Sequence, residues 1–227
     1  MKTELKNKLT AEFEEADFFS KLPSEIENFA LKKICDDVDD KYIYFIFEKP
    51  DAHKSLTAYF HEETREYKVR VKIGLNEFCL TNFFTDDFQH FIKILDEELA
   101  AAIKNLDTPL DVDADILIAD KNFSAWTYAD ELPKNLEGFE LFASPKNPIK
   151  ITNGSYIIIN YSDFENEREL SIVYNVYTDN FSGESQIGGV NHPLYIFDAK
   201  DLKQLEKILI KNLSYALNDI RQEVNLE

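Results

Sequence analysis

The stretch Tyr42-Ile43-Tyr44-Phe45-Ile46-Phe47-Glu48 opens a 65-residue segment, residues 42–106, which resembles a later segment of the same chain. Shifted by 114 positions, residues 42–106 align without a gap with residues 156–220, and 14 of the 65 positions are identical. Unrelated sequences of ordinary composition would give about 4 identities over this length. The sequence therefore predicts a tandem duplication.

The similarity extends upstream at an offset of 110 positions. Five residues of the first copy have an identical counterpart there: Leu22, Pro23, Glu27, Phe29 and Leu31 match Leu132, Pro133, Glu137, Phe139 and Leu141. The second copy then carries four extra residues in the turn-rich stretch 144–148, where an insertion has a small free-energy cost.

Each copy has the pattern of four strands followed by a long helix. Aromatic and β-branched runs with period-two alternation predict strands at 42–48, 56–61, 67–73 and 78–84. Thr85 is a plausible N-cap of a helix whose apolar residues recur every three or four positions until Pro109 ends it. The second copy gives strands near 156–161, 170–177, 186–190 and 194–197 and a helix over 201–224. We therefore expect an α+β fold, with two pseudo-twofold-related units of four antiparallel strands and a helix.

These patterns divide the chain into four parts. Residues 1–21 contain an amphipathic helix over 3–20, residues 22–110 form the first repeat, and residues 132–227 form the second. Between the repeats, residues 111–131 read as a connecting strand and loop, because Val112, Ala114 and Ile116 alternate with aspartates.

Charge and composition narrow the class of protein. The net charge is −18, from 43 acidic and 25 basic residues, which disfavours phosphate backbones and anionic lipid and favours a basic partner. The two cysteines, Cys35 and Cys79, do not suggest a disulfide framework. No signal peptide is visible, and the longest apolar run, residues 42–47, is too short to span a bilayer. We expect a cytoplasmic protein without a membrane segment.

The order of elements resembles that of the Whirly single-stranded-DNA-binding fold over about residues 42–106 and 156–220. The resemblance implies two sheets and two helices in a pseudo-twofold pair. It is one of topology, since the short basic Lys-Gly-Lys-type motif of that family is not present. The chain is also similar to type III secretion chaperones, which are acidic and α+β, although those have a helix where residues 74–77 here form a short connection.

Two groups of charged residues are candidate binding sites. The acidic group could receive a basic protein partner, and it consists of Asp36, Asp37, Asp39, Asp40, Asp111, Asp113 and Asp115. The basic group could contact nucleic acid, although an ordinary solvated sheet face is the favoured explanation, and it consists of Arg65, Lys68, Arg70 and Lys72. A calcium loop starting at Asp111 is excluded, because Ile116 stands where the turn needs glycine and Asn122 where a bidentate glutamate belongs.

No catalytic motif, metal-ligand spacing or cofactor-binding motif is present in the sequence. We therefore expect no enzyme activity, no metal and no cofactor. The leading hypothesis is an acidic protein-interaction module, either an immunity- or antitoxin-like inhibitor of a basic partner or a chaperone. The alternative is a Whirly-like protein that binds single-stranded nucleic acid.

Overall fold

Two antiparallel sheets organise the chain in the computed structural model, which describes residues 1–151 and 154–223. The chain divides into two units, Met1–Thr108 (unit 1) and Pro109–Glu227 (unit 2). Each unit contains its own cluster of buried apolar residues, between the sheet and the helical segments of that unit. The chain is thus a mixed α and β protein.

Unit 1 contains three helices, α1 (Thr3–Glu15), α2 (Asp17–Lys21) and α3 (Phe88–Asp107). The single helix expected over residues 3–20 is wrong in one respect, because it is broken at Ala16, whose backbone is extended (φ −79°, ψ 109°). Helix α3 begins at the N-cap Asp87, whose side chain accepts a hydrogen bond from the His90 amide. Its buried stripe includes Phe91, Leu95 and Leu99.

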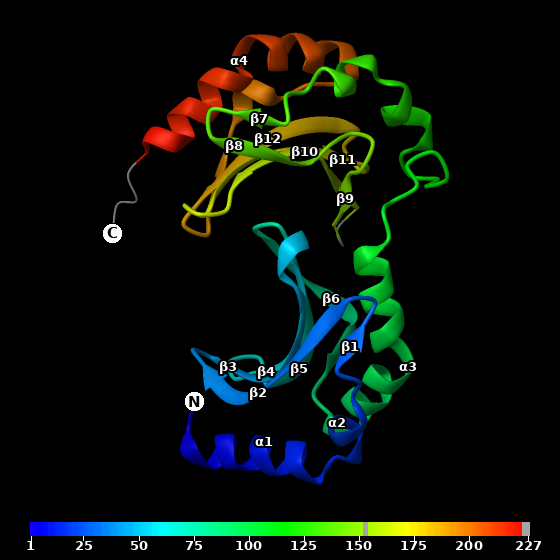
Figure 1. The fold of residues 1–227 in the computed structure, drawn as a ribbon, viewed down its shortest axis with the longest axis vertical. Coiled ribbons are helices and arrows are strands. Elements are labelled where there is room, and N and C mark those ends of the chain that lie inside the picture. The colour runs from blue at the N-terminus through cyan, green and yellow to red at the C-terminus, as the bar shows by residue number, and fades with distance from the viewer. Residues whose placement is uncertain (152–153, 224–227) are drawn as a thin grey trace. The chain divides into compact units, whose positions relative to one another are not determined.

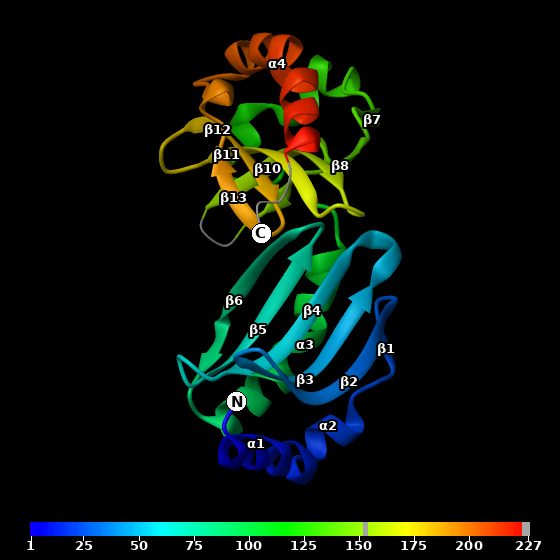
Figure 2. The same cartoon turned by 90° about the vertical axis from the view of Figure 1, so that its left-hand side faces the viewer.

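The sheet of unit 1 is a six-stranded meander in which each strand pairs with the next along the chain. Its strands are β1 (Glu25–Ile26), β2 (Phe29–Val38), β3 (Lys41–Lys49), β4 (Lys54–His61), β5 (Glu66–Ile73) and β6 (Asn76–Thr85), with the 3-10 helix η1 (Pro50–Ala52) between β3 and β4. The sheet is curved, with α1 and α3 on its convex side (Figure 1). The other face carries no helix and is turned toward the viewer in Figure 2.

Unit 2 opens with three short 3-10 helices, η2 (Ala119–Lys121), η3 (Phe123–Ala125) and η4 (Thr127–Asp130), and ends with α4 (Leu202–Gln222). Its strands are β7 (Asn135–Leu136), β8 (Phe139–Ala143), β9 (Ile149–Lys150), β10 (Ser155–Asp163), β11 (Arg168–Asn175), β12 (Asn180–Ile187) and β13 (Val190–Pro193). The spatial order is β13-β12-β11-β10-β8-β7, and β9 pairs with β10. Helix α4 lies on the convex side of this curved sheet (Figure 1).

The expected four strands per unit are therefore too few. In unit 1 the four predicted strands correspond to β3–β6, but β1 and β2 precede them; in unit 2, β7, β8 and β9 were likewise not predicted. The sequence of β2 contains Lys32, Lys33, Asp36 and Asp37, so its apolar alternation is too weak to be recognised.

The strand expected within residues 110–124 is absent from the described structure, where this segment forms turns and 3-10 helices. The Asp111 carboxylate accepts hydrogen bonds from the amides of Asp113 and Ala114, and the Asp115 carboxylate accepts one from the Leu117 amide. Side chains that bond to the backbone two or three residues ahead stabilise turns and compete with strand pairing. The hydrogen bonds of these aspartates therefore stabilise turns in the described structure, in place of the strand that the alternating pattern predicts.

The last two strands expected in the second copy are also displaced. Residues 186–190 are not one strand, because β12 ends at Ile187 and the left-handed residues Gly188 and Gly189 turn the chain into β13. Residues 194–197 include the 3-10 helix η5 (Tyr195–Phe197) instead of a strand. Gly183 accommodates η5, since a Cβ atom at this position would lie 2.8 Å from the Phe197 side chain.

The two sheets show the same internal spacing as the repeated sequence. Adding 114 to the bounds of β3, β4 and β5 gives the bounds of β10, β11 and β12. The pairing of β3 with β4 shifts register between Ile43 and Phe45, and that of β10 with β11 shifts between Ile157 and Ile159, also 114 positions later.

Candidate partner-binding groove

An apolar groove of about 550 Å³ lies in unit 1 between α2, β1 and α3. One wall comes from α2 and the segment that follows it, and the other wall comes from α3. Its lining residues are Phe18, Lys21, Leu22, Pro23, Ile26, Gln89, Ile92, Lys93, Leu95, Asp96, Leu99 and Ala100.

The local sequence explains why this groove stays open. Helix α2 has only five residues and is anchored by Phe19, which is 1% exposed and packs edge-on against Phe18 with ring centroids 5.4 Å apart. Pro23 and the two-residue strand β1 then follow, so no bulky element covers the adjacent turns of α3. Leu95 and Leu99 form a buried floor, and the small side chain of Ala100 leaves space above it.

Charged groups lie at the rim of the groove. Lys21 forms an ion pair with Asp17, and this contact lowers the pKa of the Asp17 carboxyl. The pKa of Lys21 is raised by Asp17 and, from farther away, by Asp96. Lys93, on the other wall, pairs loosely with Glu97 at 3.9 Å. The rim thus holds paired charges around an apolar centre, as protein-binding surfaces commonly do.

The corresponding region of unit 2 is closed by contacts to α4. Trp126, 7% exposed, donates its indole N–H to a Glu206 carboxylate oxygen at 2.9 Å. Ser214 donates its hydroxyl to the Glu137 carboxylate at 2.6 Å, and Arg221 donates to the Glu137 carbonyl at 3.2 Å. At the 114-residue offset, the α3 residues equivalent to Glu206, Ser214 and Arg221 are Ile92, Ala100 and Asp107. Within residues 1–151 and 154–223, polar contacts to α4 therefore span the region of unit 2 that corresponds to the groove of unit 1.

The first acidic group of the sequence forms a cluster at one end of the unit 1 sheet. The β2–β3 turn and the β4–β5 turn lie side by side, since the Glu62 amide donates to the Asp40 carbonyl at 2.8 Å. We name this cluster the acidic tip, and its residues are Asp36, Asp37, Asp39, Asp40, Glu62 and Glu63. Glu62 and Glu63 were not predicted, because only pairing of the two turns brings them beside the aspartates.

Several carboxylates of the acidic tip already have partners. Lys6 of α1 bonds to Asp36 at 2.5 Å and to Asp37, and the Lys6 ammonium lowers the pKa of Asp37 to about 2. Asp40 pairs with Lys41 at 2.8 Å, and Lys41 lowers the pKa of the Asp40 carboxyl. Asp39, which is exposed at the turn, has a left-handed backbone (φ 56°).

One atom each of Asp40, His61 and Glu63 lies within 4.8 Å of the others, a spacing that could suit a metal ion. The hydrogen bonds of His61 argue against metal binding through its Nε2 atom. Its Nδ1 accepts from the Thr64 amide at 3.3 Å, so its proton lies on Nε2, which faces Asp40 at 2.8 Å. A histidine that binds metal through Nε2 instead carries its proton on Nδ1. We therefore interpret this trio as a hydrogen-bonded turn.

The second acidic group stabilises the local structure of unit 2. It consists of Asp111, Asp113 and Asp115. Asp111 and Asp115 accept the amide hydrogen bonds described above, and Asp113 accepts from the Ser124 hydroxyl at 2.6 Å. Burial acts to raise the pKa of Asp115, but hydrogen bonds from Lys150, the Leu117 amide and Tyr156 outweigh it, and the pKa is lowered. These carboxylates therefore accept hydrogen bonds within unit 2 and stabilise this segment.

The basic row of β5 lies on the helix-free face of the unit 1 sheet and is largely paired. Lys68 contacts Glu66 at 2.8 Å and lies 4.9 Å from the centre of the Phe84 ring. Arg70 pairs with Glu77 at 2.6 Å. Arg65 lies outside the strand, in the β4–β5 turn, with a left-handed backbone (φ 57°). The structure therefore places Lys68, Arg70 and Lys72 on one face and separates Arg65 from them.

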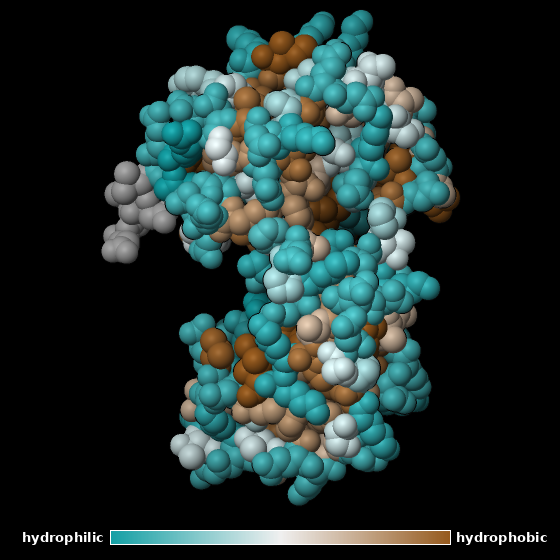
Figure 3. All heavy atoms as spheres, viewed as in Figure 1, coloured by the Kyte–Doolittle hydropathy of each residue, from teal (hydrophilic) through white to brown (hydrophobic). Residues whose placement is uncertain are grey.

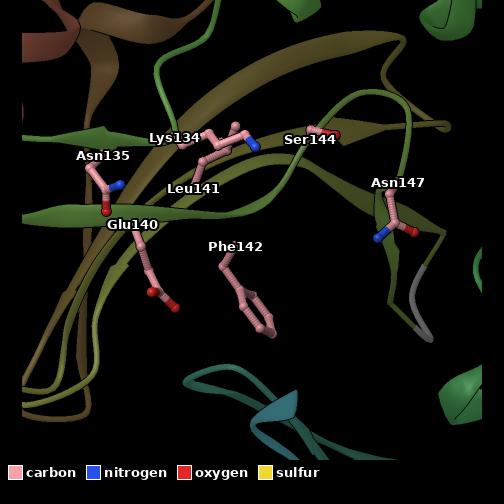
Figure 4. Close-up of a pocket in the computed structure, with 7 residues that line it drawn as sticks. All are labelled: Lys134, Asn135, Glu140, Leu141, Phe142, Ser144 and Asn147. Atoms are coloured by element: carbon pink, nitrogen blue, oxygen red, sulfur yellow. The ribbon is translucent and has the colours of Figure 1, made fainter. Parts of the chain in front are cut away.

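A second hollow of about 430 Å³ follows β7 and β8 in unit 2. Figure 4 shows that its side chains diverge: Glu140 and Phe142 point to one side of β8, and Lys134 lies on the other. A binding site for a small ligand needs polar groups that converge on one point. This hollow lacks that arrangement.

The groove could not be recognised from the positions of charged residues, because most of its lining is apolar. A signal was nevertheless present in the aligned repeats, where Ile92 and Ala100 replace the polar residues Glu206 and Ser214. Comparison of the chain with protein-family models, curated proteins and solved structures found no match. Within residues 1–151 and 154–223, every helix is too short or too polar to cross a lipid bilayer.

Proposed function

We propose that this chain is a non-enzymatic protein-interaction module, and that the groove between α2 and α3 binds a basic, amphipathic helical segment of a partner protein. One observation carries the proposal: the apolar groove is open in unit 1, whereas polar contacts to α4 close the same region in unit 2. An exposed apolar groove with a polar rim is the usual feature by which a protein receives an amphipathic helix.

The charge of the chain supports a basic partner. Residues 1–108 carry 23 acidic and 15 basic side chains, and residues 109–227 carry 20 and 10, so both units are net negative. A field of this sign speeds the encounter with a cationic surface and disfavours anionic ones. In this account the acidic tip attracts the partner, and the groove supplies the apolar contact.

Two roles fit such an interaction. An immunity- or antitoxin-like protein would use the groove to inhibit a basic toxin, and a chaperone or adaptor would use it to hold an amphipathic segment of a client. Both roles need binding without catalysis, and both place the partner on unit 1.

A second candidate function is the binding of single-stranded nucleic acid, as the topological resemblance to the Whirly fold suggests. It is favoured by the common face of Lys68, Arg70 and Lys72, where the Arg70 guanidinium also lies 5.9 Å from the Tyr59 ring. The ion pairs with Glu66 and Glu77 reduce the charge available to phosphates. We therefore rank this function below protein binding.

We also propose that the two units arose by duplication of one ancestral unit. The shared strand bounds and register shifts support this, as do the N-caps Asp87 and Asp201, each of which accepts a hydrogen bond from the amide three residues ahead. Trp126, Glu206 and Ser214 then mark where unit 2 diverged from unit 1 and closed its groove.

Purification of the tagged protein from lysate of its own cells, with and without nuclease, tests the proposal. We expect a stoichiometric basic protein that survives nuclease and is released by salt, because salt screens the attraction between opposite charges. Recovery of nucleic acid alone, lost on nuclease treatment, would reverse the ranking of the two functions. Recovery of neither class of partner would contradict both.

A further inference from the structure

Helix α4 presents to solvent a face that combines lysines with large apolar side chains. Its exposed positions include three lysines at intervals of four residues and two large apolar side chains, Ile210 at 66% and Tyr215 at 68% exposure. Figure 3 shows apolar residues in brown among hydrophilic ones over α4, at the top of the view. We name this surface the lysine face, and its residues are Lys203, Lys207, Ile210, Lys211 and Tyr215.

The lysines of the lysine face differ from the three lysines of unit 2 that form ion pairs. Lys121, Lys146 and Lys150 form ion pairs with aspartates at 2.5–2.7 Å. Across residues 1–151 and 154–223, by contrast, Lys203, Lys207 and Lys211 form no ion pair or side-chain hydrogen bond. A concentration of free positive charge beside exposed apolar side chains is typical of a docking surface.

Helix α3 shows that the fold does not require this surface. At the 114-residue offset, Asp96, Glu97 and Ala101 stand where α4 has Ile210, Lys211 and Tyr215. The other two positions have Gln89 in place of Lys203 and a retained lysine, Lys93, at Lys207, so the α3 face keeps one of the three lysines and neither of the two large apolar side chains. The buried stripes of the two helices retain Leu95 and Leu99 as Leu209 and Leu213, so the two helices keep a common buried side while their exposed faces differ.

The acidic tip of unit 1 is complementary to the lysine face in charge and in apolar character. It gathers six carboxylates, and Asp36 has a side chain that is 61% exposed despite its contact with Lys6. Strand β2 adds two exposed apolar side chains at this end, Ile34 at 37% and Val38 at 49% exposure. The surface therefore offers anions and apolar contacts where the lysine face offers cations and apolar contacts.

We infer that the lysine face of one molecule docks on the acidic tip of a second copy of this chain. Because the two surfaces differ, the contact is heterologous, so a dimer leaves one tip and one lysine face free for further copies. The exposed residues of one helix face form a small interface, so we expect a weak, salt-sensitive assembly that grows with protein concentration. This inference does not use the groove, but it shares the acidic tip with the proposed function, in which that surface attracts the partner.

An anionic membrane or a nucleic acid would also attract lysines, but neither suits the rest of the molecule. The chain has a net charge of −18, which repels phosphate-rich surfaces beyond the local patch. The acidic tip of another copy is a better match for the lysine face, because it offers carboxylates together with apolar side chains.

Analytical ultracentrifugation of the full chain over a range of concentrations, in about 20 mM and about 500 mM salt, tests this inference. We expect the mean mass to rise with concentration at low salt and to return to that of the monomer at high salt. Lys207→Glu/Lys211→Glu should remove the rise, and so should Asp39→Lys/Glu63→Lys. The matched control, Lys32→Glu/Lys104→Glu, makes the same charge change on residues outside the groove and the acidic tip, and it should leave assembly within about twofold of wild type.

Mixing the two charge-reversal variants gives the sharpest result. Each variant alone has lost one of the two complementary surfaces and should stay monomeric. In the mixture, the unchanged lysine face of one variant meets the unchanged acidic tip of the other, so the mixture should assemble. Circular dichroism melting of each variant checks that the fold is intact. A wild-type chain that remains monomeric at low salt would overturn the inference, as would assembly that Lys207→Glu/Lys211→Glu does not weaken, or variants that fail to assemble when mixed.

Discussion

The indole N–H of Trp126 and the carboxylate of Glu206, 2.9 Å apart, join the opening segment of unit 2 to its long helix. The α3 counterpart of Glu206 is Ile92, which lines the open groove of unit 1. At this aligned position, unit 2 therefore has a polar contact where unit 1 has an apolar wall. This difference is the basis for assigning partner binding to unit 1.

Removing the hydrogen bond between Trp126 and Glu206 should lower the stability of unit 2. Glu206→Ala leaves the indole N–H without its acceptor, and we expect a loss of about 1–3 kcal/mol in the free energy of unfolding. Trp126 is the only tryptophan, so its fluorescence during urea unfolding reports on unit 2. Glu206→Gln retains an acceptor oxygen and should recover most of the loss. Equal stability of wild type and Glu206→Ala would show that the contact does not hold the segment.

Two buried tyrosines of unit 1 should respond differently to loss of the hydroxyl group. The Tyr67 hydroxyl donates to Glu12 at 2.8 Å, and Tyr67→Phe should cost about 1–3 kcal/mol by removing a charge-assisted hydrogen bond. The Tyr44 hydroxyl is buried near Tyr67, but it has no hydrogen bond of good geometry within residues 1–151 and 154–223.

Tyr44→Phe should therefore change stability by less than about 0.5 kcal/mol, or increase it, because no hydrogen bond is lost. Urea unfolding followed by far-ultraviolet circular dichroism measures both variants. A larger loss for Tyr44→Phe than for Tyr67→Phe would contradict the hydrogen bonding described for this aromatic cluster.

The contact of Lys6 with Asp37 should make part of the stability depend on pH. The pKa of Asp37 is lowered to about 2, mainly by the hydrogen bond from Lys6, so the contact stabilises the fold above the ordinary aspartate range. This contribution is lost as the pH falls toward 2. The pKa of Lys6 is raised by Asp36 and Asp37, so the contribution of the lysine is lost only at strongly alkaline pH.

Melting temperatures of wild type and Lys6→Met between pH 7 and pH 2 test this dependence. We expect the difference between them to be constant near neutral pH, to shrink below about pH 4 and to vanish near pH 2. A difference that persists unchanged to pH 2 would contradict a contribution from the ionised Asp37 carboxylate.

Each unit should fold without the other, because each has a separate cluster of buried residues. We expect fragments 1–108 and 109–227 to melt cooperatively when produced alone. Circular dichroism and limited proteolysis provide the measurement. A fragment that lacks a cooperative transition would show that its core needs the other unit.

The strands with clear apolar alternation were predictable from sequence, and they correspond to β3–β6 in unit 1. Strand β2 was not, because it is held by pairing with β3 while its own residues are mostly charged. The segment after α3 was misread for the opposite reason, since its period-two pattern is real but Asp111 and Asp115 bond to nearby amides. Local side-chain hydrogen bonds outweighed periodicity there.

The candidate sites were less predictable than the fold. Sequence identified the aspartates of the acidic tip but not Glu62 and Glu63, which only the pairing of two turns brings close. It identified the row Lys68, Arg70 and Lys72, but not the carboxylates of Glu66 and Glu77 that pair with two of them. The groove depends on the short length of α2 and on the small side chain of Ala100 above Leu99. Neither feature can be recognised from the positions of charged residues.

The most direct test of the central claim, that the groove of unit 1 binds the partner, compares two neighbouring alanines of α3. Ala100 lines the groove, whereas Ala101 is exposed outside its lining, so Ala100→Trp fills the groove and Ala101→Trp adds the same bulk beside it. The measurement is the affinity of each variant for the protein that co-purifies with wild type, by isothermal titration calorimetry. We predict that Ala100→Trp weakens binding at least about tenfold, or about 1.4 kcal/mol, and that Ala101→Trp changes it by less than about twofold. Equal affinity of wild type and Ala100→Trp would contradict the claim.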